Sequence, residues 1–207
     1  GGVGITNRGP GEKALELDRR KIEEKISDLN KDLELIGKER LTQRKRRKKS
    51  ELPTVALVGY TNAGKSTLMN AMVELSRKSE AKKVLERNVL FATLDTSVRN
   101  ITLPDNRAFL LLDTVGFVSK LPHNLVKAFR STLEEVSSAD LLLHVIDVSS
   151  SAHEEQIEVT EKTLQQIGAE GIPTIYVYNK SDLTSLNFSI IGHDKVFISA
   201  LKRTGLN

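Results

Sequence analysis

The stretch that most constrains this chain is the octapeptide GYTNAGKS, which directly follows an apolar run at 54–58. Its spacing of glycines, lysine and hydroxyl is typical of a loop between a strand and a helix whose backbone N–H groups surround phosphate oxygens. In such a loop Lys65 reaches the terminal phosphates and the Ser66 hydroxyl binds Mg²⁺. The expected nucleotide-binding residues of this segment are Gly59, Tyr60, Thr61, Asn62, Ala63, Gly64, Lys65, Ser66 and Thr67.

Three further motifs follow apolar segments in the order that a guanine-nucleotide site requires. In DTVG, the Asp113 carboxylate can hold Mg²⁺ through water and the Gly116 N–H can meet the γ-phosphate. In NKSD, the Asp182 carboxylate can accept two hydrogen bonds from the guanine edge, which adenine cannot supply. In SAL, a backbone N–H can support the guanine carbonyl. The residues expected near the base are Asn179, Lys180, Asp182, Ser199, Ala200 and Leu201.

Strand and helix patterns alternate along residues 53–207. Apolar runs occur at 54–58, 107–113, 139–147, 173–179 and 195–199, and helical patterns at 65–77, 124–136 and 154–168. A further strand near 98–103, followed by PDNR, is the first arm of a hairpin. The expected fold is α/β, a doubly wound and mostly parallel sheet that carries its ligand at the carboxyl ends of the strands.

Charge divides the chain into a basic arm and a nearly neutral body. Residues 1–50 hold 15 Lys and Arg against 9 Asp and Glu (+6), and residues 51–207 hold 16 against 18 (−2). The chain contains no cysteine, so disulfides and thiolate zinc sites are excluded. No apolar run approaches the roughly 20 residues that cross a bilayer. We expect a cytoplasmic protein, and the first residue, which is not Met, predicts a piece of a longer chain.

The arm, 1–52, begins with GGVGITNRGPGEK, whose glycines and proline predict neither a helix nor a central strand. From Ala14 onward, apolar residues recur at helical spacing and form a narrow stripe that needs a partner helix, upstream or in another chain. The stripe consists of Leu15, Ile22, Ile26, Leu29, Leu33 and Ile36. The run RKRRKK at 44–49 is either solvated surface or a contact for an RNA backbone, which we favour beside a nucleotide-binding body.

With these motifs in view, the chain resembles the HflX family of translation-associated GTPases. The resemblance lies in RGPGEK, LELDRRKIEEKI, VALVGYTNAGKSTLMNA, LFATLDTSVR, LLDTVGFV, LPHNLVKAFRSTLEEV and YNKSD. It implies a Ras-like P-loop GTPase domain at 53–207, preceded by the second helix of a helical hairpin. It also implies binding to the large ribosomal subunit and its rRNA, and a role in splitting or rescuing ribosomes under stress.

The chain departs from the family pattern in two places, with Lys13 for a threonine and LDTSVR for LDPTTR. The second departure lies in switch I, the segment that supplies a hydroxyl to Mg²⁺. The resemblance implies Thr93 as this ligand, with Thr96 as the alternative. The expected Mg²⁺ ligands are therefore Ser66, Thr93 and Asp113, and the expected catalytic residues are Lys65, Thr93 and Gly116. The domain is also expected to lack its last helix.

GTP hydrolysis depends on positioning and charge stabilisation. Phe117 directly follows DTVG, where small signalling GTPases have a glutamine that orients the attacking water. We therefore expect slow intrinsic hydrolysis, stimulated by a partner. Asn62 resembles the asparagine that potassium-activated GTPases use as a K⁺ ligand, although it can equally support the loop by hydrogen bonding. His144, inside an apolar strand, is expected to be a core residue with its hydrogen bonds satisfied.

The favoured function is a GTP-dependent, monomeric switch that binds ribosomes. The alternative is an RNA-binding module in which GTP mainly stabilises the fold. A membrane-associated GTPase held by RKRRKK is disfavoured, because cations alone anchor a protein weakly.

Overall fold

The computed structural model describes residues 10–48, 52–76, 97–117, 133, 135–185 and 193–206. Within 10–48, the described side chains are those of residues 11, 14–32, 34, 35 and 38. The chain forms two compact units, Gly1–Ser50 and Glu51–Asn207.

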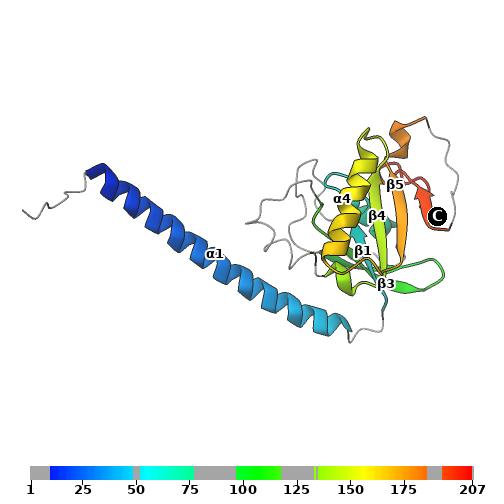
Figure 1. Ribbon diagram of the computed structural model, residues 1–207. Helices are drawn as coiled ribbons and strands as arrows, with labels where there is room; N and C mark the ends of the chain where they lie inside the picture. Colours follow the sequence, from blue (N-terminus) through cyan, green and yellow to red (C-terminus); the bar gives the residue numbers. More distant parts are fainter. Residues whose placement is uncertain are drawn as a thin grey trace, which may run out of the picture. The chain divides into compact units, whose positions relative to one another are not determined.

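The first unit contains the helix α1, Pro10–Lys48 (Figure 1). Its start corrects the expectation that the opening stretch is not helical, since residues 10–13 belong to the helix. Proline suits a first helical turn because its fixed φ matches the helix and its missing N–H has no partner to lose there. Along the helix, Glu16 forms an ion pair with Arg20 at 3.9 Å, and Arg19 forms one with Glu23 at 2.9 Å.

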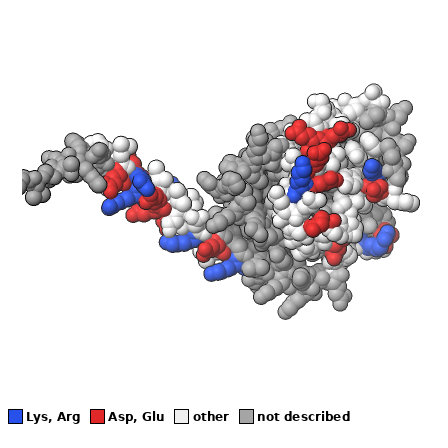
Figure 2. All heavy atoms as spheres, in the orientation of Figure 1, with Lys and Arg blue, Asp and Glu red and all other residues white. Residues whose placement is uncertain are grey.

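The apolar stripe of α1 is exposed wherever its side chains are described. Leu15, Ile22, Ile26 and Leu29 expose between 53% and 72% of their surface, so this helix does not bury its own stripe. Leu33, Ile36 and the cations of 44–49 lie outside the described side chains. Acidic and basic residues are interspersed along the helix in Figure 2. No helix among the described residues has both the length and the apolarity needed to cross a bilayer.

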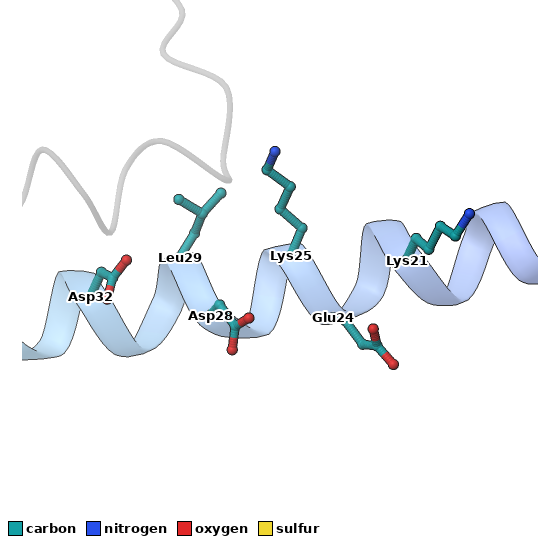
Figure 3. Close-up of a pocket in the computed structure, with 6 residues that line it drawn as sticks. All are labelled: Lys21, Glu24, Lys25, Asp28, Leu29 and Asp32. Atoms are coloured by element: carbon teal, nitrogen blue, oxygen red, sulfur yellow. The ribbon is translucent and has the colours of Figure 1, made fainter.

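A hollow of about 440 Å³ runs along α1. It is lined by Lys21, Glu24, Lys25, Asp28, Leu29 and Asp32 (Figure 3). In that view Lys25 and Leu29 extend from one side of the helix, and Glu24 and Asp28 from the other. Because all six residues come from a single helix, they do not enclose a ligand, and the hollow supports no site.

The second unit is built on a six-stranded sheet with the order β2-β3-β1-β4-β5-β6 (Figure 1). β2 runs antiparallel to β3, and all other neighbours are parallel, which confirms the expected fold. The strands are β1 Thr54–Val58, β2 Ser97–Thr102, β3 Ala108–Asp113, β4 Leu141–Asp147, β5 Thr174–Asn179 and β6 Lys195–Phe197. β6 is therefore two residues shorter than the apolar pattern predicts.

Helices cover both faces of this sheet. Alternate residues of β1 point to opposite faces, and each set packs against a different helix. Leu57 belongs to one buried cluster with Leu68 of α2, Lys65–Leu75. Val58 belongs to the other with Leu164 of α4, His153–Gln166. Two short 3₁₀ turns, η1 Val136–Ser138 and η2 Ser181–Leu183, complete the described elements. Most of the helix expected at 124–136 lies outside the described residues.

The parallel register brings the carboxyl ends of several strands to one edge. Leu57 of β1 is paired with Asp113 of β3, and Asp147 of β4 with Asn179 of β5. The loops that leave these strands therefore meet at the edge where α/β sheets bind ligands.

Candidate functional site

The loop 59–64 connects β1 to α2 and turns its backbone toward the helix N-terminus. Gly64 caps α2 with a φ of 96°. A Cβ at this position would lie 2.3 Å from Asn179 Nδ2, so both backbone conformation and space require glycine there. The free N–H groups at the start of a helix and its dipole favour an anion, which makes this loop suited to phosphate.

Lys65 is folded back over the loop that precedes it. Its Nζ donates hydrogen bonds to the carbonyl oxygens of Gly59 at 3.2 Å and Tyr60 at 3.0 Å. The side chain is buried, and desolvation lowers its pKa to about 8 while the nearby Asp113 carboxylate acts in the opposite direction. At neutral pH the ammonium group is therefore mostly charged, within a site that shields it from water.

Ser66 and Asp113 bring two oxygen ligands together at the end of β3. The Ser66 hydroxyl donates to Asp113 Oδ2 at 2.6 Å, and Asp113 is fully buried. A hydroxyl and a carboxylate suit Mg²⁺, which takes few protein ligands and keeps water and phosphate oxygens for the rest of its shell. Among the described residues, no cluster of three or more His, Cys, Asp or Glu side chains forms a separate metal site. Thr93 and Thr96 lie outside the described residues.

The DTVG segment lies directly against the loop 59–64, which is called the phosphate loop below. Thr61 N donates to Phe117 O at 2.8 Å, and Phe117 N donates to Gly59 O at 3.0 Å. A Cβ on Gly116 would lie 2.6 Å from the Thr61 Cα, so only glycine permits this approach. The Phe117 side chain is buried in the core cluster that contains Val115 and Leu133, and does not face the site.

Asn179 joins three segments of the site through its side-chain amide. Nδ2 donates to the Ala63 carbonyl at 2.9 Å, and Oδ1 accepts from the Ala200 N–H at 3.0 Å. The adjacent Ser181 is held by a hydrogen bond from its hydroxyl to the Ile198 carbonyl at 2.5 Å. The phosphate loop, the NKSD segment and the SAL segment therefore form one hydrogen-bonded unit.

The surroundings of Asp182 lower the pKa of its carboxyl group, which favours the ionised form that accepts hydrogen bonds. A hydrogen bond from the Ser199 side chain is the largest cause that lowers its pKa, and the cation of Lys202 adds to the effect. Ser199 in turn accepts a hydrogen bond from the Lys202 N–H at 3.1 Å. Leu201 exposes 73% of its surface, so its side chain is not packed into the loop.

Asp147 adjoins the candidate site through Lys180, although no sequence motif pointed to it. Its Oδ2 forms an ion pair with Lys180 Nζ at 2.6 Å. Its Oδ1 accepts hydrogen bonds from the N–H and the hydroxyl of Ser149. Lys180 itself has a left-handed backbone with a φ of 61°. The available signal was the position of Asp147 at the carboxyl end of a predicted strand, which it shares with Asp113.

Asn62 lies in the phosphate loop with a left-handed φ of 62°. Asparagine tolerates this conformation better than most residues. The structure thus gives Asn62 a backbone role in the loop and leaves its expected ion contact as a prediction.

His144 corrects the expectation of a satisfied core histidine. It is 1% exposed, and its Nδ1 has no hydrogen-bond partner within the described part of the chain. Its ring lies 5.4 Å from that of Tyr176. Burial, with a smaller contribution from the Lys65 charge, lowers the pKa of His144 to about 4, so the ring is neutral.

Each of the two units matches a family of GTPases. Residues 54–180 match the family described as 50S ribosome-binding GTPase, and residues 1–47 match the family described as GTP-binding GTPase Middle Region. The GTPase HflX of Caldanaerobacter subterraneus is 52% identical over 206 residues, which cover 100% of this chain and 46% of the relative. The GTPase HflX of Escherichia coli K12 is 46% identical over 183 residues, covering 88% and 41%. The chain thus spans less than half the length of these relatives.

Solved structures share the fold of the chain. A GTP-binding protein of Sulfolobus solfataricus in complex with GDP is 30% identical with a TM-score of 0.58, covering 90% of this chain and 62% of that one. Era in complex with MgGDPNP and part of 16S ribosomal RNA is 24% identical with a TM-score of 0.58, covering 73% and 52%, and shows the fold alone. On its family match, its relatives and its sheet, the chain belongs to the HflX family of GTPases.

Proposed function

We propose that this chain binds GTP and GDP with Mg²⁺, hydrolyses GTP, and acts as a switch that binds the large ribosomal subunit. The observation that supports this most directly is the meeting of Lys65, Ser66 and Asp113 at one sheet edge, with Ser66 Oγ 2.6 Å from Asp113 Oδ2. A charged lysine, a hydroxyl and a buried carboxylate are what a Mg²⁺–triphosphate needs.

The phosphates would lie over the loop 59–64 and the first turn of α2. Lys65, now bound to two loop carbonyls, would transfer its hydrogen bonds to phosphate oxygens. Ser66 and Asp113, with Thr93 of switch I, would hold Mg²⁺, which supplies positive charge to the phosphates. Gly116, which packs against Thr61 of the loop, would offer its N–H to the γ-phosphate. We assign the catalytic charge stabilisation to Lys65, Thr93 and Gly116.

The guanine base would bind to the NKSD and SAL segments, which Asn179 joins by hydrogen bonds. Asp182, whose pKa is lowered by Ser199 and Lys202, would accept two hydrogen bonds from the two donors that guanine offers on its matching edge. The Ala200 N–H donates its hydrogen bond to Asn179, so we assign the Leu201 N–H of SAL as the donor to the guanine carbonyl. Lys180, held by Asp147, would lie along the base. A site with paired buried donors and acceptors rejects a base that lacks them.

Hydrolysis by the isolated chain should be slow. The side chain that follows DTVG is buried in the core, so it cannot orient a water molecule. Another group must do so, and we propose that ribosome binding supplies or repositions it. The proposed partner rests on the family description, 50S ribosome-binding GTPase, and on the cationic run at 44–49.

We further propose that α1 pairs through its exposed stripe with a second helix, as in a helical hairpin. Isolated apolar side chains on a helix are ordinary, but a repeated stripe at helical spacing indicates a packing surface.

The test is GTP hydrolysis by the chain with and without large ribosomal subunits, in potassium and in sodium buffers. Stimulation by subunits would support the partner-completed site, and a component present only in potassium would support Asn62 as a K⁺ ligand. Subunit affinity should be higher with a non-hydrolysable GTP analogue than with GDP. Equal affinity would favour the alternative, an RNA-binding module in which the nucleotide is structural.

A further inference from the structure

The turn after β6 carries two neighbouring cations that contact carboxylates on different elements. Lys202 Nζ lies 3.8 Å from Asp182 Oδ2, and the Arg203 guanidinium forms an ion pair with Glu74. The turn itself is closed by reciprocal backbone hydrogen bonds between Ser199 and Thr204, at 3.1 and 3.2 Å. One side of the turn therefore faces the proposed base-binding loop, and the other faces α2.

Neither partner of the Arg203–Glu74 pair is favoured by its local structure. Arg203 has a left-handed backbone with a φ of 59°, which non-glycine residues seldom adopt. Glu74 lies in the last turn of α2, where a negative charge opposes the helix dipole. Their side chains remain 44% and 25% exposed, so the pair contributes little to overall stability. The pair matters more for the position of the turn than for the free energy of unfolding, because it joins the turn to α2, a segment far away in the sequence.

We propose that Arg203 and Glu74 are positioning residues that hold the turn 199–204 against α2 and thereby set the residence time of guanine nucleotide. This inference rests on the proposed function. α2 begins at Lys65 beside the phosphate loop and ends at the ion pair, so it links the phosphate site to the turn. The turn supplies the Ala200 N–H to Asn179 and the Ser199 hydroxyl to Asp182. Movement of the turn away from α2 would loosen both contacts at once.

The test is the dissociation rate of N-methylanthraniloyl-GDP from the whole chain, measured by stopped-flow fluorescence. Arg203→Gln and Glu74→Gln should each accelerate dissociation about three- to tenfold, with the association rate nearly unchanged. Because the two residues act as a pair, the double variant should dissociate no faster than the single variants. The charge swap, Arg203→Glu with Glu74→Arg, should restore slow dissociation.

The matched control is Lys162→Gln, which removes an exposed ion pair with Glu158 on α4 (3.5 Å) and should leave dissociation unchanged. Single-variant rates within twofold of the unmodified chain, or a double variant equal to the product of the single effects, would overturn the inference. The inference would also be overturned if the single variants lost melting temperature in the absence of nucleotide to the same extent as in its presence. The ion pair would then stabilise the fold as a whole and not the nucleotide site. Failure of the unmodified chain to bind the probe would instead reject the proposed function.

Discussion

Asn179 and Ala63 lie 116 positions apart in the sequence, yet the Asn179 amide donates a hydrogen bond to the Ala63 carbonyl at 2.9 Å. The other end of the same amide accepts from Ala200 at 3.0 Å. All three residues are buried. One side chain therefore fixes the distance between the proposed phosphate site and the proposed base site.

Replacing this amide should disturb both the fold and nucleotide binding. Asn179→Ala leaves the Ala63 carbonyl and the Ala200 N–H without their partner, so we expect a loss of about 1–3 kcal/mol in the free energy of unfolding. GDP affinity should fall at least about tenfold, because the loops lose their common link. Denaturant unfolding and calorimetric titration measure the two effects. Asn100→Ala, at an exposed position of β2, is the control and should change neither.

Removal of the Ser66 hydroxyl should weaken binding only where Mg²⁺ is involved. For the unmodified chain, GDP affinity should be higher in Mg²⁺ than in EDTA. Ser66→Ala should lose most of this difference, because the hydroxyl beside Asp113 is one of the proposed ligands. Ser66→Thr keeps a hydroxyl and should keep the difference. A Ser66→Ala protein with the full Mg²⁺ effect would contradict the assignment.

Acid should destabilise the chain through His144. The pKa of its buried ring is about 4 in the folded state and about 6.5 in the unfolded state, so the unfolded state binds more protons between these values. The stability from the neutral ring is complete above pH 6.5 and is lost as the pH falls toward 4. Between pH 7 and pH 5 we expect a loss of about 2 kcal/mol that His144→Leu does not show. Urea unfolding at both pH values is the measurement, and equal losses in the two proteins would contradict this account.

A glutamine at position 117 should not create the missing water-orienting group. The Phe117 side chain is 1% exposed and packs in the core, so Phe117→Gln would bury an amide without partners. We expect a lower melting temperature and no rise in basal GTP hydrolysis. Phe117→Leu, which keeps an apolar side chain, should cost less stability. A glutamine variant with clearly faster basal hydrolysis would show that this side chain reaches the nucleotide.

The local structure of the proposed site follows from the amino-acid pattern alone. The octapeptide, the apolar run before it and the helical pattern after it predict a strand, a loop and a helix at nearly the observed bounds. Backbone conformations at glycines and the period of apolar residues depend on near neighbours, so they can be read from a pattern. The same reasoning predicted strands ending at Asp113 and Asn179, and a sheet that places their ends at one edge. It was wrong at Pro10 and at the end of β6, where local signals are weak, and it was wrong about the hydrogen bonding of His144, which depends on tertiary packing.

The contacts of individual side chains, in contrast, depend on the packing of the whole domain. DTVG predicts a glycine near phosphate, but the packing against the sheet decides that Phe117 faces the core. NKSD predicts base recognition, but the register of β4 and β5 decides that Lys180 meets Asp147. Burial of Lys65 and His144, and the pairing of Arg203 with Glu74, likewise depend on elements far apart in the chain. Such contacts follow from how strands pair and helices pack, and no local spacing along the sequence encodes them.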